Sequence, residues 1–301
     1  MKNSLSINGG GIRGIIPCSV LAALEQQTGK LTCDLFSYVA GTSTGALLAA
    51  GVAAGIPASQ LLTVYTTRSK EVFTPTGLIA DAKRVADGFM YDPKRLFNVL
   101  GGVFGSAAAW SMNDCPIGIC IPATAVNGHD WYFVRDGVRN ARTTGTVRLI
   151  EAAVASASAP TYFDHWPLTV QGQALAFFDG GTGGLANPSY QVCVEMFEYD
   201  TFTPAETRLV SLGTGFYPGS NAPPKGLIEI ISWATDTLVD TSEDWVDCAV
   251  ERQWPGVKQK FDWQLPSDIA MDELSAIPAL LAAGKAAAAS IDWKQVLGEL
   301  A

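Results

Sequence analysis

The sequence predicts an α/β fold with a mostly parallel central sheet, and two observations carry that prediction. Apolar, strand-like runs at residues 5–8, 36–40 and 174–178 each end in a glycine-rich turn. Helical patterns lie between such runs, and the first of them places Leu21 and Leu24 on one face. Strands that alternate with helices are typical of parallel sheets, because parallel neighbours need a long crossover connection.

Local residue chemistry explains where the expected elements begin and how they pack. Pro17 suits a first helical turn, because the N–H that proline lacks has no helical partner there in any case. Small residues at 44–55 let a helix lie close to the sheet. Further helical segments are expected at 57–70, from 93 onward, and at 147–157, 187–197, 227–254 and 271–298, the last interrupted near Pro278 and Gly284. Further strands are expected at 117–121, 131–134, 208–212 and 261–265.

Composition and charge restrict the class of protein. The chain has 301 residues, of which 48% are hydrophobic and 16% are charged, so it can bury a large core. We find no internal repeat and no low-complexity linker, and we expect one domain over residues 1–301. The net charge is −9 and no block of lysine or arginine occurs. This balance argues against nucleic-acid binding and against electrostatic capture by an anionic membrane, whereas apolar contact with lipid stays open.

The cysteines and the apolar runs suggest a protein of the reducing cytoplasm. None of the six cysteines forms a CxxC pair or has a nearby histidine, so we expect buried free thiols and no metal site. No signal peptide precedes the first strand, and the apolar window at 46–56 is shorter than the roughly 20 residues that span a bilayer. We therefore expect a soluble, cytoplasmic protein.

The motif Gly41-Thr42-Ser43-Thr44-Gly45 predicts a serine nucleophile. It follows the second strand and opens a helix, and in that context GxSxG is typical of a sharp turn that exposes the serine hydroxyl. Gly41 and Gly45 relieve crowding at the turn. The helix amino terminus also favours a developing oxyanion. A tight strand-to-helix turn with a capping serine is the structural alternative.

The loop Gly9-Gly10-Gly11-Ile12-Arg13-Gly14 presents backbone N–H groups at the start of a helix. Taken alone, it fits two sites equally well. One is an oxyanion hole, and the other is a dinucleotide site in which Asp34, 20 residues after Gly14, binds the ribose. Ser43 after the next strand favours the oxyanion hole, since a dinucleotide fold does not need that turn. We expect Arg13 to hold the loop or to contact a substrate phosphate.

The base for Ser43 is expected to be Asp179, which a strand delivers into the motif Asp179-Gly180-Gly181. Asp-Gly-Gly by itself is a common turn. However, the chain has two histidines only, His129 and His165, and neither has a spacing that recommends it as the base. A carboxylate can serve if it hydrogen-bonds the hydroxyl while an oxyanion hole lowers most of the barrier. A triad through His165 is the alternative.

Together these residues resemble the patatin-like phospholipase family, and the likeness extends over nearly the whole chain. Tyr91-Asp92 is similar to the plant storage patatins in particular. The family usually has aspartate where this chain has Asn8. Five motifs in the same order carry the resemblance: the glycine loop at 9–14, Gly-Thr-Ser-Thr-Gly at 41–45, Ala-Pro-Thr-Tyr-Phe at 159–163, Asp-Gly-Gly at 179–181 and Ser-Leu-Gly-Thr-Gly at 211–215.

The resemblance implies a three-layer α/β/α fold and a dyad in which Ser43 is the nucleophile and Asp179 is the base. It implies no cofactor and no metal. The substrate implied is a membrane lipid or another lipid ester, reached by transient contact with a membrane surface. The oxyanion hole would comprise Gly9, Gly10, Gly11, Arg13 and Gly14, flanked by the elbow glycines Gly41 and Gly45 and by Gly180 and Gly181.

We therefore expect a metal-independent lipid acyl hydrolase that works through an acyl-enzyme. Segments 71–90 and 101–112 are candidates for a mobile wall over an acyl groove. Three alternatives stay open on the sequence. They are an acyltransferase that uses the same dyad, a nucleotide-binding module built on the glycine loop, and a silent storage or interaction protein.

Overall fold

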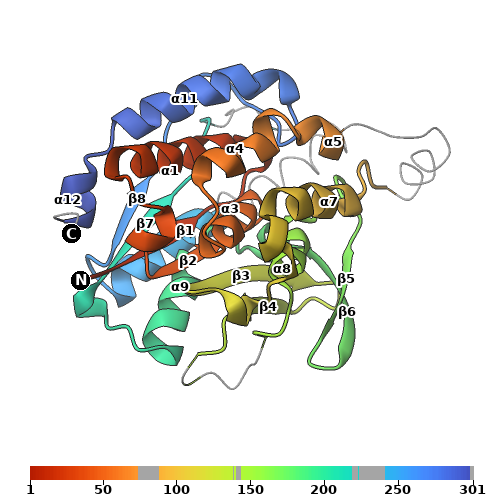
Figure 1. Cartoon of the computed structure of the whole chain (residues 1–301), viewed down its shortest axis with the longest axis horizontal. Coiled ribbons are helices and arrows are strands. Elements are labelled where there is room, and N and C mark those ends of the chain that lie inside the picture. Colours follow the sequence, from red (N-terminus) through yellow and green to blue (C-terminus); the bar gives the residue numbers. More distant parts are fainter. Residues whose placement is uncertain (74–87, 138, 140–143, 219–222, 224–240, 299–301) are drawn as a thin grey trace.

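The computed structural model describes residues 1–73, 88–137, 139, 144–218, 223 and 241–298 (Figure 1). Its strands are β1 (Lys2–Ile7), β2 (Tyr38–Gly41), β3 (Gly118–Ala125), β4 (Asp130–Val134), β5 (Trp166–Val170), β6 (Gln173–Asp179), β7 (Thr207–Leu212) and β8 (Lys258–Phe261). Its α-helices are α1 (Ile15–Thr28), α2 (Thr32–Leu35), α3 (Thr44–Ala53), α4 (Ala58–Thr66), α5 (Ser69–Phe73), α7 (Pro93–Phe104), α8 (Leu149–Ala157), α9 (Ser189–Val194), α11 (Ile277–Ala289) and α12 (Trp293–Leu297). Residues 241–253 are also helical.

The strands form one mixed sheet. Within the described residues its order is β5-β6-β3-β2-β1-β7-β8, and β4 pairs with β3 outside this path. The strands β3, β2, β1, β7 and β8 run parallel, whereas β4 and β6 are antiparallel to β3, and β5 is antiparallel to β6. The carboxyl ends of β1 and β2 therefore share one edge, where the glycine loop and Ser43 follow them. The strand β6 pairs antiparallel with the last residues of β3. Its final residue, Asp179, lies opposite Ala123 and therefore near the same edge.

Helices cover both faces of the sheet, which gives three layers (Figure 1). Alternate residues of β2 separate the two cores: Val39 faces the larger one, and Tyr38 and Ala40 face the smaller. The larger core lies under α1, α3, α4, α7 and α8, and α11 packs on α1. The smaller core lies under α9 and helix 241–253. The predicted α/β fold is confirmed.

The structure corrects three details of the predicted elements. The strand expected at 261–265 is β8, which ends at Phe261. The helical stretch expected at 271–298 is interrupted, but not at Gly284: α11 ends at Ala289, residues 290–292 are not helical, and α12 follows. Pro278 lies in the first turn of α11, and this helix continues past Gly284. A β-carbon at Gly284 would lie 2.7 Å from Ser19, so this glycine permits close packing of α11 on α1 rather than a break. The β5–β6 hairpin adds a strand that the sequence analysis missed.

The described residues cover only part of two further expectations, the helix at 227–254 and the lack of a membrane-spanning segment. Of the helix expected at 227–254, residues 241–253 are helical, and 227–240 lie outside the described residues. No described helix is both long and apolar enough to cross a membrane.

Candidate functional site

Ser43 occupies a strained backbone position between β2 and α3. Its φ is +56° and its ψ is −124°, in a region that residues other than glycine rarely adopt. The flanking glycines explain how the turn closes. A β-carbon at Gly41 would lie 2.0 Å from the Gly45 carbonyl oxygen, and one at Gly45 would lie 2.2 Å from the Ile7 carbonyl oxygen. The backbone N–H of Ser43 donates to Ser156 Oγ at 3.1 Å, which helps to hold the turn.

Asp179 ends β6 with its side chain beside Ser43. Its backbone N–H donates to the Ser158 carbonyl at 3.0 Å, and its Oδ1 accepts the Gly181 N–H at 2.7 Å. Burial raises the pKa of this carboxyl from 3.8 to about 6, although hydrogen bonds from the Ser43 hydroxyl and Gly181 act in the opposite direction. A carboxylate of this pKa beside a serine hydroxyl has the basicity of a group that exchanges protons near neutral pH.

The glycine loop lies against the Ser43 turn and leaves two amides available. The Gly9 N–H donates to the Ala186 carbonyl at 2.9 Å, so this amide already has a partner. Gly10 and Gly11 have φ of +150° and +58°, and their N–H groups have no hydrogen-bond partner within the described residues. Thr214 Oγ1 donates to the Gly9 carbonyl at 2.7 Å and fixes the loop from the end of β7. Of the three glycine amides expected at the oxyanion hole, only those of Gly10 and Gly11 are therefore without a partner in the described part of the chain.

Arg13 and Gly14, also expected at the oxyanion hole, make contacts within and beside the loop. Arg13 Nε donates to the Gly10 carbonyl at 3.3 Å, a contact that fits the first of the two roles expected for it, holding the loop. Gly14 is buried, and a β-carbon there would lie 2.2 Å from Thr44 Oγ1 and 2.8 Å from the Tyr65 hydroxyl. Gly180 is similarly confined, since its β-carbon would lie 2.7 Å from the Pro122 carbonyl oxygen.

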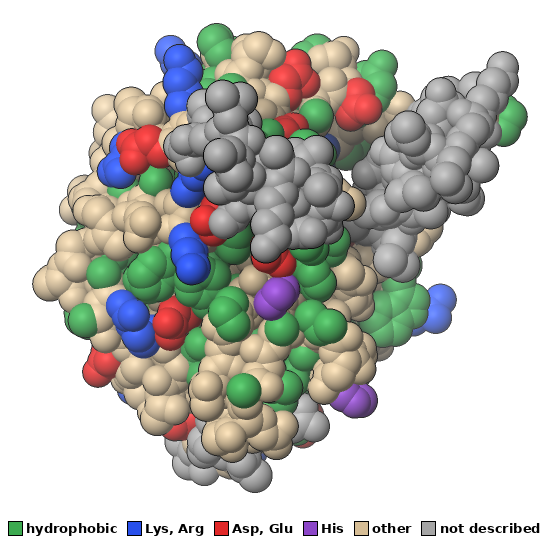
Figure 2. Space-filling model, turned by 90° about the vertical axis from the view of Figure 1, so that its right-hand side faces the viewer, with side chains coloured by type: hydrophobic (Ala, Val, Ile, Leu, Met, Phe, Trp, Pro, Cys, Tyr) green, Lys and Arg blue, Asp and Glu red, His purple; other side chains and the backbone are tan. Residues whose placement is uncertain are grey.

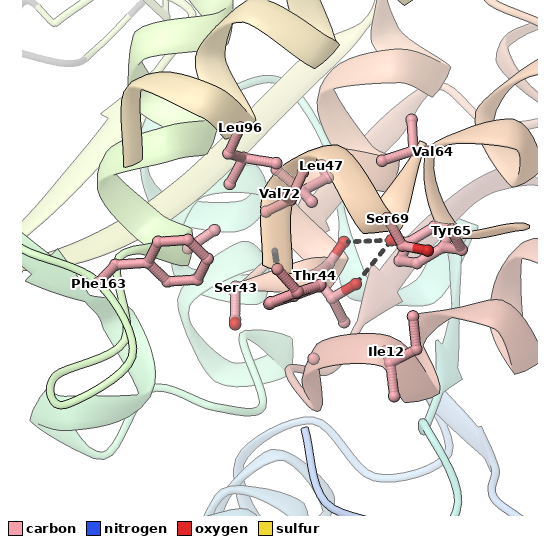
Figure 3. Close-up of a pocket in the computed structure, with 13 residues that line it drawn as sticks. Ile12, Ser43, Thr44, Leu47, Val64, Tyr65, Ser69, Val72, Leu96 and Phe163 are labelled. Atoms are coloured by element: carbon pink, nitrogen blue, oxygen red, sulfur yellow. Dashed lines mark hydrogen bonds between the residues drawn. The ribbon is translucent and has the colours of Figure 1, made fainter. Parts of the chain in front are cut away.

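An apolar cavity of about 50 Å³ opens beside Ser43 (Figure 3). Thr44 and Tyr65 share a buried hydroxyl–hydroxyl hydrogen bond of 2.6 Å on one side of it, and Phe163 lies on the other. Phe163 is the last residue of the Ala-Pro-Thr-Tyr-Phe motif, which gives that motif a place in the site. The cavity walls come from α3, α4, α5 and α7 and include Leu47, Val64, Val72, Phe73 and Leu96.

The two segments expected to form a mobile wall differ in their relation to this cavity. Val72 and Phe73 of the first line it, and residues 74–87 of that segment lie outside the described residues. None of residues 101–112 lines it. Instead, Phe104 and Met112 are buried in the larger core, and the Trp110 carbonyl accepts the Leu149 N–H. The second segment is therefore packed structure and not a wall of the cavity.

Two of the alternatives weighed on the sequence, the dinucleotide site and the histidine base, fit the geometry poorly. Asp34 precedes β2, so it lies at the sheet edge opposite the glycine loop, and it accepts the Leu31 N–H as a helix cap. A ribose-binding acid would have to follow that strand. His165 Nδ1 pairs with Asp164 at 2.8 Å, and His129 lies exposed in the turn between β3 and β4. No hydrogen bond within the described residues joins either histidine to Ser43.

Several residues that support the site were not singled out from the sequence. Ser156 and Ser158, at the end of α8, bind Ser43 and Asp179 respectively. Thr42 Oγ1 donates to the Leu185 carbonyl at 2.6 Å and joins the Ser43 turn to the loop after Asp179. Ser156 carries no local signal, and Thr42, although it lies within a quoted motif, gives no sign of its partner, because both partners are distant in sequence. Thr214 lies within a quoted motif and could have been assigned.

No group of three or more His, Cys, Asp or Glu side chains within the described residues is arranged to hold a metal ion.

Comparison with known proteins identifies the family. A family model described as patatin-like phospholipase matches residues 5–188. The chain is 31% identical over 202 residues to a cGAMP-activated phospholipase of Escherichia coli, covering 64% of this chain and 55% of that protein. It is 28% identical over 230 residues to a Vibrio cholerae protein with the same name, covering 70% and 63%. It is 27% identical over 245 residues to patatin-17 of Solanum cardiophyllum, covering 71% and 61%.

The chain thus spans between half and two thirds of the length of these curated relatives. The matched residues 5–188 include the glycine loop, Ser43, Asp179 and the cavity walls. The resemblance noted in the sequence is confirmed: the chain belongs to the patatin-like phospholipase family.

Proposed function

We propose that this chain is a lipid acyl hydrolase, which cleaves ester-linked fatty acyl chains of phospholipids with Ser43 as nucleophile and Asp179 as base. The observation that carries the proposal is the meeting of three parts at one point. A serine on a strained turn lies beside a buried carboxylate whose pKa is about 6, and an apolar cavity opens beside the serine. Relatives named phospholipases support the same reaction class.

In the first half of the reaction, Ser43 attacks the ester. Asp179 accepts the hydroxyl proton as Ser43 Oγ forms a bond to the acyl carbon. The carbonyl π pair moves to oxygen, where the unpartnered Gly10 and Gly11 amides stabilise the negative charge. The tetrahedral intermediate then collapses, the ester C–O bond breaks, and the leaving alkoxide takes the proton from Asp179. A lyso-lipid leaves and the acyl group stays on Ser43.

In the second half, water replaces the lipid alcohol. Asp179 accepts a proton from water as the water oxygen forms a bond to the acyl carbon. The Gly10 and Gly11 amides stabilise the second oxyanion. Collapse breaks the bond to Ser43 Oγ, which regains the proton from Asp179, and a fatty acid leaves. The small apolar cavity suits the acyl chain near the ester, because its walls offer hydrocarbon surface and little polar surface.

Hydrolysis by defined variants tests this proposal. Wild type, Ser43→Ala, Asp179→Asn and His165→Ala are compared on a short-chain p-nitrophenyl ester and on phosphatidylcholine, with a chelator present. We expect the first two variants to lose activity and His165→Ala, which alters an exposed side chain, to keep it. Loss in His165→Ala by a folded protein would reinstate a histidine triad. An inactive wild type that also escapes labelling by a fluorophosphonate would end the proposal.

We further propose that the site meets its substrate at a lipid surface through exposed apolar side chains. Met90 and Phe216 are both exposed and lie near residues of the site. The Met90 N–H donates to the carbonyl of Thr161, two residues before the cavity residue Phe163. Phe216 follows Thr214, which binds the glycine loop, by two residues. Val126, at the end of β3, is 61% exposed. Figure 2 shows hydrophobic side chains between charged ones on the face near β5, β6, α5 and α7.

Vesicle binding tests this contact separately from the chemistry. We expect Val126→Asp and Phe216→Asp to weaken flotation with phosphatidylcholine vesicles and to lower activity on vesicles, while activity on the soluble ester stays near that of wild type. Exposed Tyr199→Asp is the matched control, because Tyr199 lies after α9, on the other side of the sheet from the cavity. Equal binding by all variants would refute the contact.

A further inference from the structure

Two loops of the candidate site are tied to the same helix, residues 241–253. Asn8, immediately before the glycine loop, donates from Nδ2 to Glu243 Oε2 at 2.8 Å. Asn187, in the loop that follows Asp179, donates from Nδ2 to Asp247 Oδ1 at 2.7 Å. Glu243 and Asp247 lie four residues apart, so they occupy neighbouring turns on one side of this helix.

Two lysines of β8 join the carboxylates into one network. Lys260 Nζ lies 2.8 Å from Asp247 Oδ2 and 3.8 Å from Glu243 Oε2, and Lys258 Nζ also pairs with Asp247. Burial alone would lower the pKa of Lys260, but the hydrogen bond to Asp247 raises it, so the lysine stays charged. Fixed, charge-assisted contacts of this kind restrict the helix to one placement beneath the loops.

The tether at Asn8 acts on the amides that the mechanism uses. Asn8 is buried, and its backbone N–H bonds the Leu212 carbonyl at 3.0 Å. Its Oδ1 is buried without a hydrogen-bond partner in the described part of the chain, so the side chain is held there through Glu243 alone. Two and three residues later come Gly10 and Gly11, whose backbone conformations only glycine adopts readily.

We propose that Glu243 is a positioning residue: through Asn8 it holds the oxyanion loop, while Asp247 holds the loop after Asp179 through Asn187. The inference rests on the proposed function, because it assigns the Gly10 and Gly11 amides to the oxyanion. It also reaches beyond the residues that match the family model, which end at 188. The family's usual aspartate at position 8 would here place two carboxylates in contact, whereas Asn8 donates to Glu243.

Reversal of the hydrogen bond provides the test. Glu243→Ala removes the acceptor, and Asn8→Asp replaces the donor by a second carboxylate. Glu243→Gln keeps an acceptor in place. The double variant Asn8→Asp/Glu243→Gln restores a donor–acceptor pair with the direction reversed. Glu251→Gln is the matched control, because it removes one charge from an exposed side chain of the same helix.

We expect Glu243→Ala and Asn8→Asp each to lower kcat on the soluble ester by about tenfold or more with little change in KM, since misplaced oxyanion donors act on the transition state. Glu243→Gln and Glu251→Gln should stay within about threefold of wild type, and the double variant should recover most of the loss in Asn8→Asp. A double variant no better than Asn8→Asp, or full activity in Glu243→Ala, would overturn the inference.

Hydrogen exchange separates this result from failure of the proposed function. Deuterium uptake of peptides that cover residues 8–14 should rise in Asn8→Asp and Glu243→Ala, and return toward the wild-type level in the double variant, whether or not the protein hydrolyses an ester. An inactive wild type with this exchange pattern would refute the hydrolase and keep the tether. Uptake that is the same in all variants would refute the tether.

Discussion

Asp179→Asn is expected to abolish hydrolysis and, at neutral pH, to stabilise the fold. The folded protein keeps this carboxyl in a buried site where its pKa is about 6, compared with 3.8 for the ordinary group. Ionisation of Asp179 therefore opposes folding at neutral pH. Asparagine does not ionise, and its amide oxygen can still accept the Gly181 N–H that bonds Asp179 Oδ1 at 2.7 Å. If Asp179 is the base that we propose, activity and stability conflict at this carboxylate.

The magnitude and its pH window follow from linkage. Below pH 3.8 the carboxyl is protonated in both states and its titration contributes nothing. Between 3.8 and about 6 the folded state keeps the proton that the unfolded state has lost, so the free energy of unfolding decreases as pH rises. At about 1.36 kcal/mol for each pKa unit, the full decrease is about 3 kcal/mol. Above about pH 6 the free energy of unfolding of the wild type stays lower by this amount. The Asp179→Asn variant does not lose it, because its amide does not ionise.

Urea denaturation of wild type and Asp179→Asn at several values from pH 4 to pH 7.5 measures the effect. The difference in free energy of unfolding should change by about 3 kcal/mol in favour of the variant across that range. Asp268→Asn, at an exposed carboxylate, is the matched control for the loss of one charge. A difference between wild type and Asp179→Asn that does not change with pH would refute the reasoning.

Four further outcomes are expected. The kcat/KM of wild type should rise about tenfold per pH unit below about 6 and level above it, as Asp179 ionises; a flat profile over pH 5–8 would contradict this. Ser156→Ala, which removes the acceptor for the Ser43 N–H, should lower kcat by about tenfold while far-UV circular dichroism stays unchanged. Leu96→Trp, in the cavity wall, should reduce activity on long acyl esters more than on acetyl esters, and equal losses would argue against an acyl pocket. Gly101→Ala, in α7 with nothing within 4 Å of the new β-carbon, should stabilise the protein by about 0.5–1 kcal/mol in thermal unfolding and leave activity unchanged.

The sequence predicted the parts of the fold that depend on local pattern. Apolar runs followed by glycine turns located β1, β2 and β6, and small-residue stretches located α3 and α8. The antiparallel placement of β6 beside β3 could not be read in this way, because strand order depends on packing between distant segments. Gly284 misled the reading of α11 for the same reason: whether a helical glycine breaks the helix or packs it depends on its neighbour, here Ser19.

For the candidate site, the motifs predicted which loops meet but not how each amide is used. Gly9, Gly10 and Gly11 are identical residues in sequence, and they differ only in the partners that the fold supplies. The Ala186 carbonyl, 177 residues away in the chain, takes the Gly9 N–H. In the same way, no pattern near Asn8 indicates that Glu243 faces it. Such contacts become visible only when the sheet and its helices are assembled.

The pairing of β1 affects which fragments of this chain can be expressed as soluble protein. The family match ends at residue 188, yet β1 lies in the middle of the sheet, with β2 on one side and β7, residues 207–212, on the other. A fragment trimmed to the match would leave the backbone of β1 without its β7 partner and expose its unpaired N–H and C=O groups along that side. Open edges of that kind recruit strands from other molecules. We expect such a fragment to precipitate where a longer one stays in solution, so the end of the family-model match does not mark the end of the sheet.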